Sequence, residues 1–322
     1  QGWAQVTAEL AFERSGPERL LSSYRLVFEM LRELSGKADT MQKAAIGRIA
    51  AHLITLRRMS LSVAGMLAKG EDPSLEATVV KDLGAVFEQE IPNIAHQILE
   101  RNGRGEDYLR VLDMLTMIAP SFSLRGGTHA LRDGQRRDAF VVLIALGRYV
   151  VPLPVAEGVL APAPLDPHLK GAAMRATQMA GAIERALDIT VEYARARVQF
   201  GKPIGSFQAI QQQLAIVAGQ FAAASAAAAA AFETLAREED PWRDIAVAKL
   251  RAGEAAGIVC GIVHQVHGAI GFTDEYILHH FTRRLWKWRA EFGNESEWSV
   301  KLGDWALSQG ADGFWPAIAT RA

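Results

Sequence analysis

The 322-residue sequence has little of several features that would mark other kinds of protein. It holds one cysteine, Cys260, which excludes an internal disulfide framework and fits a reducing compartment. Lysine plus arginine number 35 and aspartate plus glutamate 36, so no charge excess indicates a nucleic acid or an anionic membrane as partner. With 49% hydrophobic and 22% charged residues, the composition is that of a globular protein.

Continuous apolar segments are short as well. None reaches the roughly 18 residues that a membrane-spanning helix needs, and the alanine-rich run 221–232 is interpreted as a tightly packed helix. No signal peptide is evident, but the chain opens Gln1-Gly2-Trp3 without a methionine, so its ends are treated as provisional. We expect a cytoplasmic protein without a membrane span and without a metal site.

Strand patterns are nearly absent, and apolar residues recur at three- and four-residue steps through most of the chain. This periodicity predicts amphipathic helices. Apolar stripes run over 20–31, 44–56 and 75–99, and two more long helices are expected at 209–235 and 242–266. The predicted fold class is therefore all-α.

Five prolines lie between Val151 and Pro167, which makes this segment the obvious linker. The sequence thus predicts two helical bundles of four or more helices each. The expected domains are 1–137, a linker with the remnant of another helical domain at 138–166, and 167–322.

The second half carries two motifs that suit a nucleotide. In the first, 193–208, a helix ends in a basic turn, glycine and proline break it, and a new helix begins. Arg197 can hold a phosphate by paired hydrogen bonds, and Phe200 offers a flat face to an adenine or flavin ring. Taken alone, Arg197 is better interpreted as a solvated arginine beside an ordinary loop.

The second motif is Gln265-Val-His267-Gly268-Ala269-Ile-Gly271-Phe272. Its glycines let the backbone come close to a ligand, and Gln265 supplies amide donors. In this order, with helices between them, the two motifs resemble the carboxy-terminal helical domain of acyl-CoA dehydrogenases.

The resemblance implies that these segments contact an FAD held mainly by a neighbouring subunit. The FAD contacts it implies are Arg197, Gln199, Phe200, Gln265, Gly268 and Ala269. Ala269 stands where the family usually has its second glycine, and its methyl group is expected to be tolerated. Three histidines, His267, His279 and His280, are interpreted as structural or merely exposed.

The same family places its catalytic glutamate either in a late loop or in an early helix of this domain. In the second half the late position is Phe292, one residue after Glu291, and the early position falls near Gly171. The resemblance therefore implies that the second half binds flavin but has no base.

The first half is expected to supply that base. Residues 10–19 resemble the opening helix of the long-chain and isovaleryl subclass, which implies that Glu13 is the catalytic glutamate. The segment 121–128 resembles the late loop, and Gly126 stands there where the other subclass has its acid.

The residues themselves leave the setting of Glu13 open. Either the ring of Pro17 crowds the carbonyl of Glu13 in a continuous helix, or Ser15 caps a helix that begins there, with Glu18 completing a capping box. Without the family, a solvent-facing Glu13 paired with a neighbouring arginine is the preferred interpretation.

Each half lacks what the other has, and together they resemble the alpha and beta subunits of heteromeric acyl-CoA dehydrogenases fused into one chain. No Arg-x-x-Phe-Gly precedes Pro152, and no acid occupies the two family positions after it. The resemblance implies FAD-dependent oxidation of an acyl-CoA to the trans-2-enoyl-CoA, electron transfer to an electron-transfer flavoprotein, and a homo-oligomer. Because the family's middle β-domain has no counterpart in either half, a non-catalytic helical scaffold is the alternative, and an acyl-CoA oxidase is a closer rival.

Overall fold

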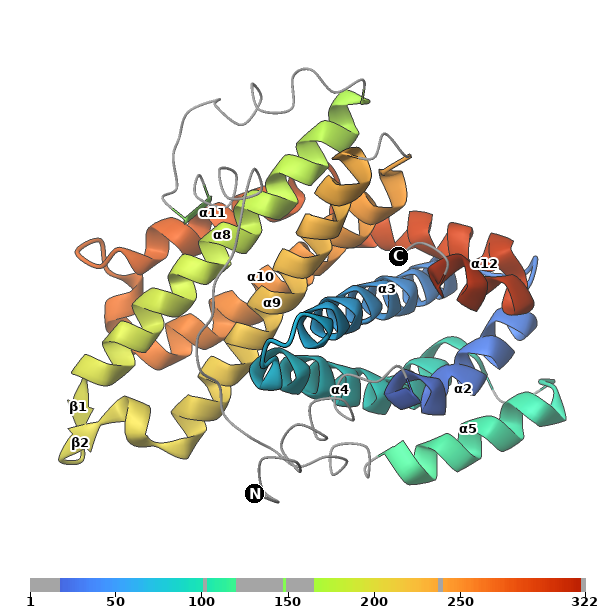
Figure 1. The fold of residues 1–322 in the computed structure, drawn as a ribbon, viewed down its shortest axis with the longest axis horizontal. Coiled ribbons are helices and arrows are strands. Elements are labelled where there is room, and N and C mark those ends of the chain that lie inside the picture. Colours follow the sequence, from blue (N-terminus) through green and yellow to red (C-terminus); the bar gives the residue numbers. More distant parts are fainter. Residues whose placement is uncertain (1–17, 101–102, 120–146, 149–164, 237–239, 320–322) are drawn as a thin grey trace. The chain divides into compact units, whose positions relative to one another are not determined.

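The computed structural model describes residues 18–100, 103–119, 147–148, 165–236 and 240–319, and helices account for most of them (Figure 1). The expected all-α class is confirmed. The chain divides into two compact units: unit 1 comprises 1–133 and 296–322, and unit 2 comprises 134–295.

Unit 1 is built from helices of the first half and from the last helix of the chain. Its helices are α2 (Glu18–Leu34), α3 (Thr40–Ala68), α4 (Ser74–Ile98), α5 (Glu106–Ile118) and nearly all of α12 (Glu295–Ala319). The start of α3 follows from its sequence. The Asp39 carboxylate accepts from the Gln42 backbone N–H at 2.8 Å, and the Gln42 side-chain oxygen accepts from the Asp39 backbone N–H at 2.9 Å. This capping box satisfies two of the helix's unpaired donors.

Two glycines let α12 approach α3 closely. A Cβ atom on Gly47 would lie 1.7 Å from the Ser299 carbonyl oxygen, and one on Gly303 would lie 1.7 Å from the Lys43 carbonyl oxygen. The Lys43 ammonium also lies 2.8 Å from the Asp304 carboxylate. The domain boundaries expected from the sequence group α12 with the second half, whereas its packing places it in unit 1.

Unit 2 is a bundle in which α8, α9 and α10 each contact the other two, with α11 packed on α8 and α10 (Figure 1). Its elements are α8 (Pro167–Ala196), β1 (Val198–Gln199), β2 (Lys202–Pro203), the 3₁₀ turn η2 (Ile204–Ser206), α9 (Gln208–Ala236), α10 (Trp242–His267), the 3₁₀ turn η3 (Gly268–Phe272) and α11 (Leu278–Ala290). Asp166 caps α8 by accepting from the backbone of His168 and Leu169, and Pro167 occupies the first turn, where its missing N–H is harmless.

The helices expected at 75–99, 209–235 and 242–266 are confirmed to within one residue at each end. Among the described residues, Gln208–Leu235 and Trp242–Phe272 are long and apolar enough to cross a membrane by length and composition. The sequence analysis, which counted uninterrupted apolar runs, expected none. About half of each window is buried within the bundle, and buried core helices satisfy the same test.

Candidate functional site

The first motif forms a hairpin directly after α8, with two residues in each strand and two in the turn. Val198 pairs with Pro203 and Gln199 with Lys202 in an antiparallel register, so Phe200 and Gly201 make the turn. Both have positive φ, 52° and 78°, which is the geometry of a type I′ turn. This backbone is costly for a bulky residue, and it leaves the Phe200 ring 92% exposed at the tip.

Arg197 lies at the junction of α8 and the hairpin. Its backbone amide donates to the Tyr193 carbonyl at 2.8 Å, and its own carbonyl accepts from Ile204 at 2.8 Å, so the backbone at this point is tied on both sides. The Gln199 amide, with its oxygen toward Arg197, accepts from Nη2 at 2.7 Å and from Nε at 3.2 Å. The guanidinium is therefore oriented while the residue stays exposed.

The second motif forms the end of α10 and the turn η3. Gly268 ends α10 with φ 63°, and a Cβ atom there would meet nothing within 4 Å. Three of the sequence-predicted residues, Gln265, Gly268 and Ala269, are exposed. The Ala269 side chain thus lies at the surface rather than in a packed interior.

An aromatic cluster joins the two motifs. The rings of Tyr193 and His267 stack at 4.4 Å, and the Tyr193 hydroxyl donates to the His267 carbonyl at 3.3 Å. The ring of Tyr276 contacts both, at 6.0 Å from Tyr193 and 5.0 Å from His267. Because Tyr193 precedes Arg197 by one helical turn and His267 directly precedes Gly268, the two motifs lie at the same end of unit 2.

The hydrogen bonds of His267 determine its tautomer. Nδ1 lies 2.7 Å from the Val263 carbonyl and must donate to it, so Nε2 accepts from the Tyr276 hydroxyl at 3.2 Å. Burial lowers the pKa of His267, an effect partly offset by the Val263 carbonyl and reinforced by His264. His267 is consequently neutral and buried between the two motifs. This position fits its interpretation from the sequence as a structural histidine.

A second histidine, His264, packs against η3. His264 stacks on Phe272 at 4.1 Å, and its Nε2 lies 3.0 Å from the Thr282 hydroxyl. Burial and the neighbouring His279 lower the pKa of His264. Gly271 is buried against both histidines: a Cβ atom there would lie 3.0 Å from His267 and 3.2 Å from His264.

The surface that the two motifs form together is open to solvent rather than enclosed. Every sequence-predicted cofactor residue is exposed, and so is the ring of Phe272, at 70%. An arginine, two amides, an unobstructed glycine and an aromatic tip fit the phosphates and adenine of a dinucleotide. As an open surface, however, this face can cover only one side of such a ligand.

The two family positions for the acid lie against each other in unit 2. A Cβ atom on Gly171 would be 2.2 Å from the Phe292 ring, although 121 positions separate the two residues in the chain. Two alternative positions for one catalytic group must point to one place, so this contact supports the assignment made from the sequence. Glu291 is tied elsewhere, because its carboxylate lies 2.6 Å from Arg175 Nε.

The predicted base Glu13, together with Gly126, lies outside the described residues. Among the described residues, no cluster of three or more histidine, cysteine, aspartate or glutamate side chains could hold a metal ion. Burial raises the pKa of the Cys260 thiol to about 12, so this cysteine is not a nucleophile at neutral pH.

Tyr193, Tyr276 and Lys249 were given no role from the sequence. Tyr193 opens the first motif and Tyr276 follows the second by four residues, so nearness to the motifs was the available signal. Lys249 follows four apolar residues of α10, and a lysine in such a place indicates a buried hydrogen-bond donor.

Comparison with known proteins shows what part of the chain resembles. Residues 169–293 match the acyl-CoA dehydrogenase C-terminal domain. Over 121 residues the chain is 40% identical to acyl-CoA dehydrogenase IpdE2 of Mycobacterium tuberculosis, an alignment that covers 37% of this chain and 36% of that protein. Over 109 residues it is 38% identical to acyl-CoA dehydrogenase FadE27 of the same organism, covering 31% and 29%.

Among solved structures, butyryl-CoA dehydrogenase from Megasphaera elsdenii aligns at a TM-score of 0.42 with 29% identity, covering 48% of this chain and 38% of that one. The chain spans about a third of the length of the curated relatives it matches.

Proposed function

Because residues 169–293 match the acyl-CoA dehydrogenase C-terminal domain, we propose that the chain takes part in FAD-dependent α,β-dehydrogenation of an acyl-CoA thioester to the trans-2-enoyl-CoA. The observation that supports this most is the meeting of the two nucleotide-type motifs at one open end of unit 2. Two segments 68 positions apart, at Arg197 and Gln265, are held together there by the Tyr193–His267 stack.

Unit 2 contributes the cofactor side of the site. Arg197, oriented by Gln199, would pair with a phosphate oxygen, and the Gln265 amide and the open backbone at Gly268 would contact the same dinucleotide. Phe200 would stack on an aromatic ring of the ligand. FAD supplies the acceptor for the hydrogen that leaves the substrate's β-carbon as hydride.

Unit 1 contributes the base. Glu13 takes the α-proton of the thioester, and an apolar acyl pocket around it would raise its pKa and its basicity. Because the cofactor face of unit 2 is open, a second subunit would cover the rest of the flavin. We therefore propose that the chain forms a homo-oligomer. We also propose that it acts on an acyl-CoA, passes electrons to an electron-transfer flavoprotein and is located in the cytoplasm.

Replacement of the proposed base tests the reaction. In flavin-containing protein, Glu13→Gln should lower turnover of an acyl-CoA by roughly 10²–10⁴-fold, the usual contribution of a general base. Glu291→Gln is the matched control, because Glu291 is the next acid considered and is paired with Arg175. Near-normal activity in Glu13→Gln, or equal losses in both variants, would remove Glu13 from the mechanism.

The second candidate function is a flavin-binding subunit without catalysis. The filling of the Gly171 position by Phe292 favours it for unit 2. Purified protein that binds FAD but oxidises no acyl-CoA, with either electron-transfer flavoprotein or dioxygen as acceptor, would favour this function. Reoxidation by dioxygen alone would instead indicate an acyl-CoA oxidase.

A further inference from the structure

The turn that follows α11 has an unusual backbone. Phe292 has φ 56° and the next residue, Gly293, has φ 88°. The left-handed region suits glycine but is unfavourable for a bulky side chain, so surrounding contacts must hold Phe292 there. Such strained residues persist where their position serves a purpose.

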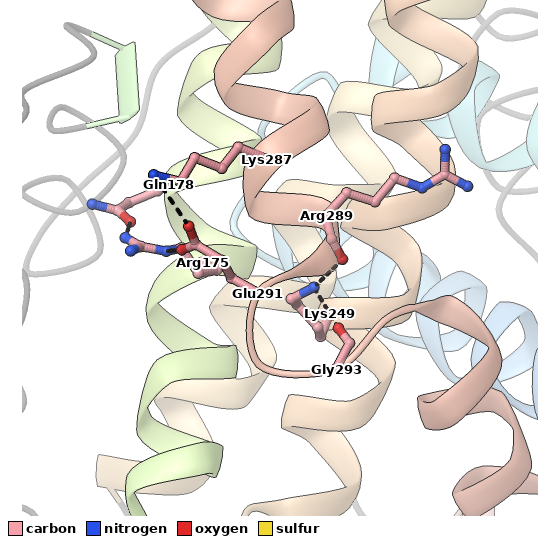
Figure 2. Close-up of polar contacts among 7 residues, drawn as sticks. All are labelled: Arg175, Gln178, Lys249, Lys287, Arg289, Glu291 and Gly293. Atoms are coloured by element: carbon pink, nitrogen blue, oxygen red, sulfur yellow. Dashed lines mark hydrogen bonds and ion pairs between the residues drawn. The ribbon is translucent and has the colours of Figure 1, made fainter.

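Lys249 provides the main contact. Its ammonium donates to the Arg289 carbonyl at 2.9 Å and to the Gly293 carbonyl at 2.8 Å, so one buried side chain bridges the two ends of the turn (Figure 2). The Arg289 carbonyl lies in the last turn of α11, where helical hydrogen bonds run out, and Gly293 is a buried residue of the turn that follows.

Arg175 holds the other side of the turn. Its Nε lies 2.6 Å from the Glu291 carboxylate, and its Nη1 donates to the Gln178 side chain at 2.6 Å (Figure 2). Lys287 lies farther from the same carboxylate, at 3.9 Å, and is mostly exposed. The Glu291 carboxylate is thus paired with Arg175 of α8.

The Phe292 ring occupies the space directly over Gly171 on α8. Any side chain at 171 would overlap the ring, since the nearest three ring atoms lie 2.2–2.4 Å from the position of a Cβ atom. His168 contacts the ring edge-on at 6.2 Å, and the Arg175 guanidinium lies 5.9 Å from its centre. Gly171 and Phe292 are therefore sterically matched: the missing side chain makes room for the ring.

We infer that Phe292 is a specificity-determining plug, which closes unit 2 to an acyl thioester at the Gly171 position, and that Lys249 is the residue that positions it. The inference rests on the proposed function and deepens it, because the ring gives a steric reason for unit 2 to carry cofactor motifs without binding a substrate at the Gly171 position. The packing it describes can be tested whether or not the chain proves to be a dehydrogenase.

A double-mutant cycle on the full chain tests the plug. Gly171→Ala should lower the melting temperature by about 4 °C or more because of overpacking. In a Phe292→Ala background the same change should be neutral or slightly stabilising, since alanine is the better helix former. A Gly171→Ala protein that fails to fold, but recovers in the double variant, would demonstrate the same coupling. Equal effects in both backgrounds would refute the plug.

A matched pair of lysine variants tests the positioning role. Lys249→Met should expose the turn to chymotrypsin cleavage after Phe292, raising the rate at least about tenfold, because its two carbonyls lose their donor. Lys287→Met removes the same charge from an exposed position near the turn and should leave the cleavage rate unchanged. Intact-mass spectrometry identifies the cut, and equal rates in the two variants would remove Lys249 from this role. If Lys249→Met does not fold, Lys249→Arg should still speed the same cut, because a planar guanidinium cannot replace the ammonium at both carbonyls.

Binding of butyryl-CoA tests the exclusion of substrate. Equilibrium dialysis should show more butyryl-CoA bound per chain in Phe292→Ala than in the unaltered protein. No gain in a folded Phe292→Ala protein whose cycle shows coupling would overturn the exclusion but not the packing. Absence of butyryl-CoA binding in every variant, with coupling intact, would instead count against the proposed function.

Discussion

Arg197 carries a charge at an open surface, and within the described part of the chain the Gln199 side chain is the partner of its guanidinium. Arg197→Ala should weaken FAD binding by roughly 10–100-fold, the value of one charge-assisted hydrogen bond of about 1.5–3 kcal/mol. Arg195→Ala, an exposed change two residues earlier on α8, should leave the affinity unchanged. Flavin fluorescence after dialysis measures both, and equal affinities would exclude Arg197 from the site.

His267 makes the stability of the site depend on pH. Burial lowers its folded pKa below the ordinary 6.5, so the unfolded chain takes up the proton first as pH falls. The free energy of unfolding should therefore decrease with falling pH between 6.5 and the folded pKa, and its full contribution should be present above 6.5. Stability rises with pH across this window.

Urea unfolding at about pH 7.5 and about pH 5.5 checks this dependence. His267→Phe should reduce the difference between the two values while His264 retains a part of it, since its pKa is lowered too. His280→Phe, at an exposed position, is the control. A His267→Phe variant with the full pH dependence would show that another group causes it.

At the scale of elements, the crossing of α3 and α12 depends on glycine at one position and not at another. Gly47→Ala should destabilise the protein by about 1–3 kcal/mol, because its Cβ atom would collide with the Ser299 carbonyl. Gly65→Ala in the same helix meets nothing within 4 Å and should stabilise by about 0.5–1 kcal/mol. Thermal denaturation measures whether each variant is less or more stable than the unaltered protein. A Gly47→Ala protein of undiminished stability would contradict the close packing of α12 on α3.

At the scale of the whole molecule, the complementary losses of the two halves predict the cofactor content. Only unit 2 has the motifs at Arg197 and Gln265, so flavin released by acid should approach one per chain. Absorbance of the released flavin against protein concentration measures the ratio. Two flavins per chain would contradict the complementary arrangement even though the family assignment would stand.

The boundaries of α4, α9 and α10 could be predicted from sequence, because the information that specifies them is local, whereas the apolar stripe 44–56 covers only part of α3. The apolar periodicity of α4, α9 and α10 lies within each segment, and Asp39 and Asp166 cap the helices that directly follow them. The cofactor motifs were also recognisable, since glycine and proline spacing is local too.

Only the tertiary structure decided which distant residues meet. The stack of Tyr193 on His267, the packing of Phe292 over Gly171 and the hydrogen bonds of Lys249 to the turn after α11 each join separate helices. The grouping of α12 with the first half is of the same kind. Periodicity states which face of a helix is apolar but not which partner covers it, because that choice depends on side-chain shapes brought together by the whole packed bundle.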